Sequence, residues 1–392
     1  MKNKGLNHKS LFLATFTNII LSTKYLHIVA LDVPYPPDYG AAIDMYFRAK
    51  CLGEMGVKVI YHCFDYGRGR SKQLEEICHE VHYYPRKGAL DSLFSSEPYI
   101  VHSRRNKLLF DRIFADEHPV FLEGTHTCAC LTDDRARSKK IFVRMHNIEE
   151  DYYRHLAEAA PVGFTKWYYS MEAKRLKRFE PLLSRATGIF SVSEKDHKDL
   201  SARFSNVEYL PPFIYNDKVE CLTGRGEYAL YHGNLMVEEN LKAAEFLLEE
   251  VFNNSEIEFI VAGKGANDLS KKYSAKNFKF IDSPTGDELT KLIQNAHVNV
   301  LPTFQPTGIK HKLVNALFTG RYCVVNPIMV EGIGLDKLCI TAKDALEMRN
   351  AITELFKKDF PVEEIVKRKE VLEKIYSNKK NAEKIVRVIF GE

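Results

Sequence analysis

The sequence lacks the cysteine pattern of a disulfide-rich or zinc-binding protein. Its 392 residues include eight cysteines, and no two of them form a C-x-x-C pair. The group Cys78-His79-x-x-His82 offers two histidines and one cysteine, without a second ligand cluster to complete a tetrahedral site. We therefore expect a reducing compartment, the cytoplasm, and no bound metal.

Long apolar segments are also missing near the N-terminus. The run from Leu11 to Leu21 holds about 11 residues and is interrupted by polar side chains, whereas a membrane-spanning helix needs roughly 20. Basic residues precede it, but the residues that follow it make a poor signal-peptide cleavage site. We interpret residues 1–23 as a dispensable leader, with a weak membrane contact as the alternative.

Two further classes of protein lack support. No expected strand is followed by the G-x-G-x-x-G pattern of a dinucleotide-binding enzyme, because only Gly40 follows the first strand and Ala262-Gly263-Lys264-Gly265 is too short. Neither a zinc finger nor an RNA-binding aromatic motif is present. The pattern disfavours a NAD-dependent dehydrogenase and a nucleic-acid-binding protein.

The composition that is present can build a large folded core. Apolar residues make up 45% of the chain and aromatic residues 11%, and 392 residues suffice for two domains of roughly 100–200 residues each. Short apolar runs alternate with helix-like stretches. Strands are expected at 26–31, 57–64, 120–122, 140–145, 188–192, 207–210, 228–232, 257–262, 278–282, 298–301 and 322–326, and helices at 42–55, 241–252, 266–273, 286–295 and 309–318.

This alternation predicts an α/β fold of two tandem Rossmann-like wound domains that face each other across a cleft. Pro211-Pro212 breaks the pattern and marks the domain boundary. We expect an N-terminal domain over 24–210 and a C-terminal domain over 213–360. Residues 361–392 predict helices alone, which we expect to pack across the domains.

One segment predicts a phosphate site. Residues 301–320 form a strand end, a loop and a helix, with Gly308 at the start of the helix and Lys310 and Lys312 in its first turn. Cations there conflict with the positive end of the helix dipole, and a bound anion would remove the conflict. A solvated helix start with incidental lysines is the alternative.

This segment resembles the donor site of family 4-type glycosyltransferases with the GT-B fold (glycosyltransferase group 1). The resemblance covers residues 25–392 and includes the loop Pro34 to Ala42, Val143 to Glu149, Ser191 to Glu194 and Tyr231 to Leu235. It implies an enzyme that transfers a sugar, a hexosyl group, from a nucleotide-diphosphate sugar to a saccharide or lipid-linked acceptor in polysaccharide or lipopolysaccharide biosynthesis. It places the acceptor in the N-terminal domain and the donor in the C-terminal one, without another cofactor.

The resemblance also implies site residues. His146 follows an apolar strand, at the edge where wound sheets bind ligands, and is the first catalytic candidate, with Asp38 as a weaker one. The loop Glu123-Gly124-Thr125-His126 could line the cleft or form a turn. The donor-binding candidates are Gly40, Gly233, Asn234, Lys264, Thr307, Gly308, Ile309, Lys310, Lys312 and Asn315.

The chain departs from the family at four positions. Two glutamates eight residues apart are replaced by Thr307 and Asn315, and an Arg and a Lys by Asn234 and Glu239. The sugar, the base and the anomeric outcome stay open as a result. A nucleotide-sugar epimerase of the same fold and a non-catalytic nucleotide-sugar-binding subunit remain alternatives. Because no Asp-x-Asp clamp occurs in a cleft loop, we expect catalysis without a divalent ion.

A basic aromatic helix is a further candidate. The stretch from Lys166 to Phe179 mixes aromatic side chains with a dense basic face. Such a helix can lie on anionic lipid, at the inner membrane face. A solvated helix packed on the N-terminal sheet is the alternative interpretation.

Overall fold

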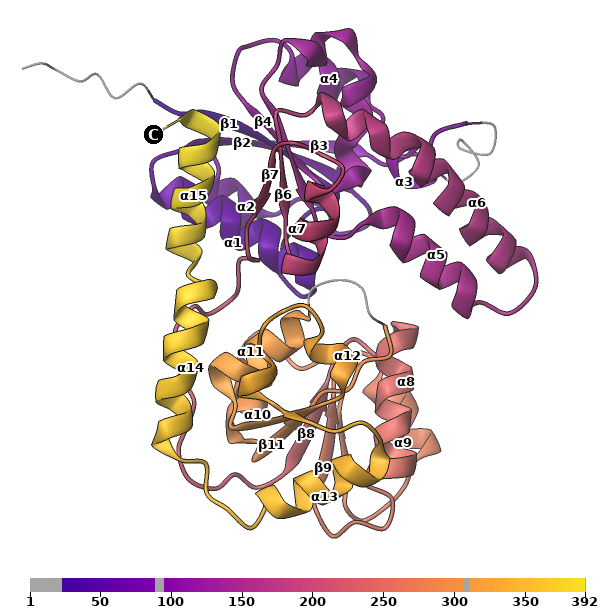
Figure 1. Cartoon of the computed structure of the whole chain (residues 1–392), viewed down its shortest axis with the longest axis vertical. Coiled ribbons are helices and arrows are strands. Elements are labelled where there is room, and N and C mark those ends of the chain that lie inside the picture. The colour runs from indigo at the N-terminus through magenta and orange to yellow at the C-terminus, as the bar shows by residue number, and fades with distance from the viewer. Residues whose placement is uncertain (1–22, 89–94, 306–309, 392) are drawn as a thin grey trace, which may run out of the picture.

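The computed structural model describes residues 23–88, 95–305 and 310–391. It contains two parallel sheets, each covered by helices, which form two Rossmann-like domains stacked along the long axis (Figure 1). The predicted fold class is confirmed. The expected leader lies almost wholly outside the described residues.

The first sheet has seven strands in the order β3-β2-β1-β4-β5-β6-β7. They are β1 (Tyr25–Ala30), β2 (Lys58–Asp65), β3 (Glu80–Pro85), β4 (Val120–Glu123), β5 (Ile141–Met145), β6 (Gly188–Ser191) and β7 (Val207–Tyr209). The helices of this domain are α1 (Gly40–Glu54), α2 (Lys72–Ile77), α3 (Tyr99–His102), α4 (Lys107–Ile113), α5 (Glu149–Ala159), α6 (Phe164–Phe179) and α7 (Glu194–Ser201).

The second sheet has six strands in the order β10-β9-β8-β11-β12-β13. They are β8 (Ala229–His232), β9 (Phe259–Ala262), β10 (Phe278–Ile281), β11 (Val298–Val300), β12 (Tyr322–Val325) and β13 (Ile340–Thr341). Its helices are α8 (Glu238–Phe246), α9 (Ala266–Lys272), α10 (Gly286–Asn295), α11 (His311–Thr319), α12 (Pro327–Val330) and α13 (Ala345–Leu355).

Most expected elements lie within a few residues of the observed ones. Two outer strands were not expected: β3, a half-buried edge strand without the continuous apolar run of a central one, and β13, which has two residues. The helix expected at 241–252 begins earlier, at Glu238, and its last part is a π-turn over Leu247–Val251. The helix expected from residue 309 begins at His311, so Lys310 is its N-cap.

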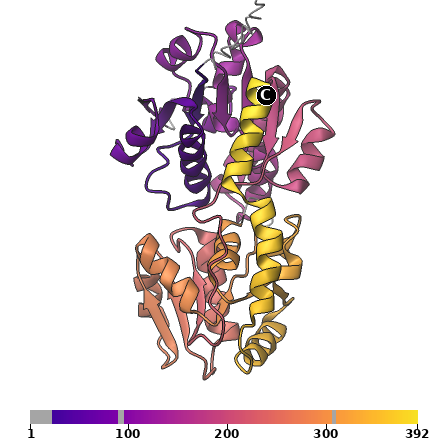
Figure 2. The same ribbon diagram turned by 90° about the vertical axis from the view of Figure 1, so that its left-hand side faces the viewer.

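Two C-terminal helices join the domains. α14 (Val362–Ile375) lies along the second domain and α15 (Asn378–Phe390) along the first (Figures 1 and 2). Leu372 of α14 belongs to the core of the second domain, whereas Ile385 and Ile389 of α15 pack in the core around α1. None of the described helices is long and apolar enough to cross a bilayer.

Candidate active site

The candidate site lies where the carboxyl ends of the two sheets approach each other. The strand order reverses between β1 and β4 in the first sheet and between β8 and β11 in the second. Wound sheets bind ligands outside the carboxyl ends of their strands at such reversals. The starts of α1 and α11 meet here, because a Cβ atom added to Gly40 would lie 2.5 Å from Cδ2 of His311.

Four charged side chains are buried together at the edge of the first sheet. Asp44 of α1 accepts hydrogen bonds from Arg48 at 2.8 Å and Arg144 at 3.2 Å, and from the backbone N–H of Phe213 at 2.6 Å. Arg48 also donates to Glu123, at the end of β4. Burial alone would raise the pKa of Asp44, but Arg144 and Arg48 outweigh it and hold that pKa well below its usual range.

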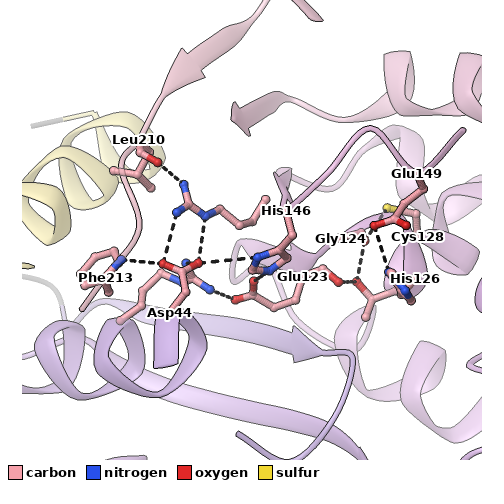
Figure 3. A network of polar contacts seen from close by, with 12 residues as sticks. Asp44, Glu123, Gly124, His126, Cys128, His146, Glu149, Leu210 and Phe213 are labelled. Carbon is pink, nitrogen blue, oxygen red and sulfur yellow. Dashed lines mark hydrogen bonds and ion pairs between the residues drawn. The ribbon is translucent and has the colours of Figure 1, made fainter. Parts of the chain in front are cut away.

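His146 follows β5 and sits between the two carboxylates of this network (Figure 3). Its Nε2 lies 3.0 Å from Oε2 of Glu123, and its Nδ1 lies 3.9 Å from Oδ2 of Asp44. Because a carboxylate only accepts, the shorter contact places the proton of the neutral ring on Nε2 and leaves Nδ1 as an acceptor. The His146 side chain is 11% exposed, so the ring is both oriented and accessible.

The same residues do not fit a metal site. Ligand atoms of Asp44, Glu123 and His146 lie within 4.8 Å of one another. Both carboxylates are already bound to buried guanidinium groups, of Arg48 and Arg144, which balance their charge. A divalent ion here would leave an excess of buried positive charge, which is strongly unfavourable.

A third acidic group lies beside this network. Glu149 at the start of α5 is buried, and burial raises the pKa of its carboxyl to about 7. Its Oε1 lies 3.9 Å from Nδ1 of His126, which has no hydrogen-bond partner among the described residues (Figure 3). Gly124 adopts a positive φ of 71°, and a Cβ atom there would lie 3.1 Å from that Nδ1. The loop after β4 therefore lines this edge and turns at Gly124.

On the second domain, the two predicted lysines turn toward α8. Lys312 Nζ lies 2.6 Å from Oδ1 of Asn240, and Lys310 Nζ lies 3.9 Å from Oε1 of Glu239. Burial lowers the pKa of both ammonium groups, to about 8 for Lys312. Both cations therefore lie at the start of α11 as predicted, and Glu239 partly compensates their charge.

The other donor-binding candidates differ in exposure and in distance from the start of α11. Gly233 and Asn234 follow β8, and the Asn234 carbonyl accepts a hydrogen bond from Asn240 at 2.9 Å. Lys264 is exposed at the end of β9, and Asn315 is half-buried one turn beyond Lys312. Thr307, Gly308 and Ile309 lie outside the described residues.

The weaker catalytic candidate, Asp38, forms a different set of contacts from His146. Asp38 is exposed and pairs with Arg68 at 2.8 Å, in the loops that follow β1 and β2. Asp44 lies next to the imidazole. Neither Asp44 nor its partner Arg48 was predicted as a site residue, although their spacing of four residues on an otherwise apolar helix face was a usable signal.

Sequence comparison does not assign the chain to a family. No protein-family model matches the chain. A Klebsiella pneumoniae protein, described as an uncharacterised 44.6 kDa protein in the cps region, is 25% identical over 330 residues, 78% of this chain and 84% of that protein.

Solved structures resemble almost the whole chain at low identity. Sucrose-phosphate synthase from Thermosynechococcus elongatus superposes with a TM-score of 0.67 at 14% identity, over 94% of this chain and 99% of that one. Anabaena Alr3699/HepE, solved with UDP and glucose, gives 0.64 at 11%, and WaaG, a glycosyltransferase involved in lipopolysaccharide biosynthesis, gives 0.64 at 12%. Each of these two covers 94% of this chain and 100% of its own. The chain therefore has the GT-B fold.

Proposed function

We propose that the chain is a glycosyltransferase that moves a sugar from a nucleotide-diphosphate donor to a saccharide or lipid-linked acceptor. One observation carries this proposal: His146, held by Glu123, lies on the edge of the first domain that meets the start of α11 in the second. In a GT-B fold, this arrangement sets an oriented imidazole opposite a cationic helix start.

The donor occupies the second domain in this proposal. Its diphosphate lies over the start of α11, where helix amides and the ammonium groups of Lys310 and Lys312 meet negative charge. Gly233 and Asn234 border the same site, and Asn315 reaches toward the ribose. The complex of Alr3699/HepE with UDP supports a UDP-sugar as the donor, and its glucose supports a hexosyl group as the group transferred.

The acceptor occupies the first domain. With its proton on Nε2 and directed at Glu123, the neutral His146 ring can accept a hydrogen bond, or a proton, from a hydroxyl at Nδ1. Asp38, in the loop after β1, and Gly40, at the start of α1, border the acceptor from the other side. A role in polysaccharide assembly is supported by the relative in a cps region and by the lipopolysaccharide role given for WaaG, and we further infer a cytoplasmic location.

Metal-independent catalysis is part of the proposal. The lysines and helix amides at α11 supply the positive charge for the diphosphate, and the Asp44 network does not fit an ion. Loss of activity in a chelator that Mg²⁺ or Mn²⁺ restores would contradict it.

A non-catalytic nucleotide-sugar-binding subunit is the second candidate, favoured by Thr307 and Asn315 in place of a glutamate pair. A panel of radiolabelled nucleotide sugars, incubated with and without saccharide acceptors, separates the candidates. Transfer of label to the acceptor supports the transferase. Formation of an epimer supports an epimerase, and binding without turnover supports the subunit.

A further inference from the structure

The hairpin of α5 and α6 projects sideways from the first domain, away from its sheet (Figure 1). Three apolar side chains lie at its tip: Val162 is 94% exposed, Phe164 76% and Trp167 57%. We call these three residues the hairpin tip. Single exposed apolar side chains are normal on a protein surface, whereas three within six residues form a patch that needs an explanation.

Packing of the hairpin itself does not explain the tip. The two helices are held together nearer their base, where the rings of Tyr153 and Tyr169 lie 6.0 Å apart, centroid to centroid. α6 buries Ala173, Leu176 and Phe179 against the domain. In the tip, the ring of Phe164 contacts that of Trp167, with centroids 5.6 Å apart, and both rings stay exposed.

The exposed charges on α6 are of one sign, whereas at the tip end of α5 the exposed Glu158 pairs with Arg154 at 3.4 Å. Trp167, Lys174 and Arg178 fall on the side of α6 opposite Leu176, since an α-helix turns by about 100° per residue. Lys174, Lys177 and Arg178 are exposed. Glu172, the acidic residue of α6, is buried and bound to Arg175 at 2.9 Å. The exposed face of α6 is therefore an aromatic end followed by a basic stretch.

We propose that the hairpin tip docks on an anionic membrane surface, with Phe164 and Trp167 among the lipid headgroups and Lys174, Lys177 and Arg178 against anionic lipid. Tryptophan favours the membrane–water interface because its ring is apolar and its N–H is polar. The basic stretch complements the negative potential of the cytoplasmic leaflet. A stable protein partner would need roughly 20–30 residues on each side, far more than the tip offers.

Docking at the tip would act on the acceptor side of the enzyme. α5 begins at Glu149, three residues after His146, so the hairpin is continuous with the edge that carries the candidate catalytic residue. A membrane-docked hairpin holds that edge near the bilayer, where a lipid-linked acceptor resides. This consequence rests on the proposed function, whereas membrane docking itself does not.

The single tryptophan of the chain makes the proposal directly measurable, because Trp167 is the chain's own fluorescent probe. The full-length protein is titrated with vesicles of phosphatidylcholine, with or without phosphatidylglycerol. We expect a blue shift of Trp167 emission, and quenching by brominated lipid, with the anionic vesicles only. Vesicle co-sedimentation gives the binding constant independently.

Two variants separate the apolar and the charged contributions. The triple variant Lys174→Gln, Lys177→Gln, Arg178→Gln should bind anionic vesicles about fivefold more weakly for each charge removed. Phe164→Ser should weaken binding roughly tenfold, because it removes an inserted ring. Leu346→Ser, which changes a 64% exposed apolar residue on the second domain, is the matched control and should bind like the parent.

Several outcomes would overturn the proposal. An unchanged emission spectrum with both kinds of vesicle would do so. A blue shift without vesicles would also overturn it. If that shift depends on protein concentration, the tip serves self-association. If UDP alone produces the shift, the tip contacts the space between the domains. Transfer to a soluble saccharide acceptor is measured in parallel. Transfer without vesicle binding rejects only the docking, and vesicle binding without transfer rejects only the transferase function.

Discussion

His146 donates from Nε2 to Glu123 across 3.0 Å, and this contact fixes the imidazole at the edge of the first domain. Glu123 is itself held by Arg48, and Arg48 by Asp44, so the orientation of the ring depends on a fully buried chain of ion pairs. Such a support costs stability unless every charge is paired. Its presence beneath a partly exposed histidine favours a functional role for that ring.

Replacing His146 tests that role. His146→Ala should lower kcat by about 10²–10⁴-fold if the ring transfers a proton, because general catalysis by one side chain contributes that much. The dissociation constant of the nucleotide should stay unchanged, since we propose that the nucleotide binds the other domain. Steady-state kinetics and calorimetry measure the two quantities.

The matched control is His79→Ala, which removes an exposed histidine of the same domain and should leave kcat unchanged. If His146→Ala instead lowers the free energy of unfolding and the rate in proportion, His146 is a structural residue.

Asp44 should be important for stability. Asp44→Ala leaves the guanidinium groups of Arg48 and Arg144 buried without their carboxylate, which should lower the free energy of unfolding by about 3–5 kcal/mol. Asp38→Ala is the control, because its ion pair is exposed and should contribute at most about 1 kcal/mol. Urea unfolding at pH 7 measures both variants.

The pH dependence of stability follows from the sign of the shift at Asp44. Its folded-state pKa is depressed, so its contribution is present above the unfolded value of about 3.9 and is lost as the pH falls below that value. The parent should therefore lose more stability than Asp44→Ala between pH 5 and pH 3. Parallel unfolding curves for the two proteins across that window would contradict the assignment.

Glu149 should change the pH dependence of stability in the opposite direction to Asp44. Its folded-state pKa is raised to about 7, so the folded state holds a proton that the unfolded state has lost, and stability falls as the pH rises from about 4.3 to 7. Glu149→Gln should remove this dependence and increase the free energy of unfolding at pH 8 by up to about 3 kcal/mol. Glu158→Gln, on the exposed side of the same helix, is the control. A destabilised Glu149→Gln would show that the carboxylate is needed in its charged form.

Local signals explain which parts of the fold could be predicted. The helix at 286–295 has the same bounds in the sequence analysis and in the structure, because the capping box of Thr285 and Glu288 and its apolar spacing are local. His146 was predicted as a site residue for a similar reason, because it is a polar residue that directly follows a buried strand, and its role stays a prediction. β3 was missed because a half-exposed edge strand has no continuous apolar run.

The buried ion-pair network around Asp44 could not be predicted from local sequence signals. Asp44 of α1 and Arg144 of β5 are 100 residues apart in the sequence and meet only in the folded first domain. Sequence patterns favour exposure of both side chains, since a charged residue is rarely buried unless it is paired. Only the packing of the first domain shows that the partners are present.

Lys312 offers the sharpest test of the donor site. A charged hydrogen bond to phosphate contributes about 1.5–3 kcal/mol, so Lys312→Ala should weaken nucleotide-diphosphate binding roughly ten- to a hundredfold and leave free nucleoside unaffected. Burial lowers the pKa of Lys312 to about 8, so parent affinity should fall as the pH rises through that value while the variant's stays flat.

Lys291→Ala, which removes an exposed lysine of α10, is the control. Calorimetry at pH 7 and pH 9 measures each protein. If Lys312→Ala binds like the parent and Lys264→Ala does not, the diphosphate lies at the end of β9 instead of over α11.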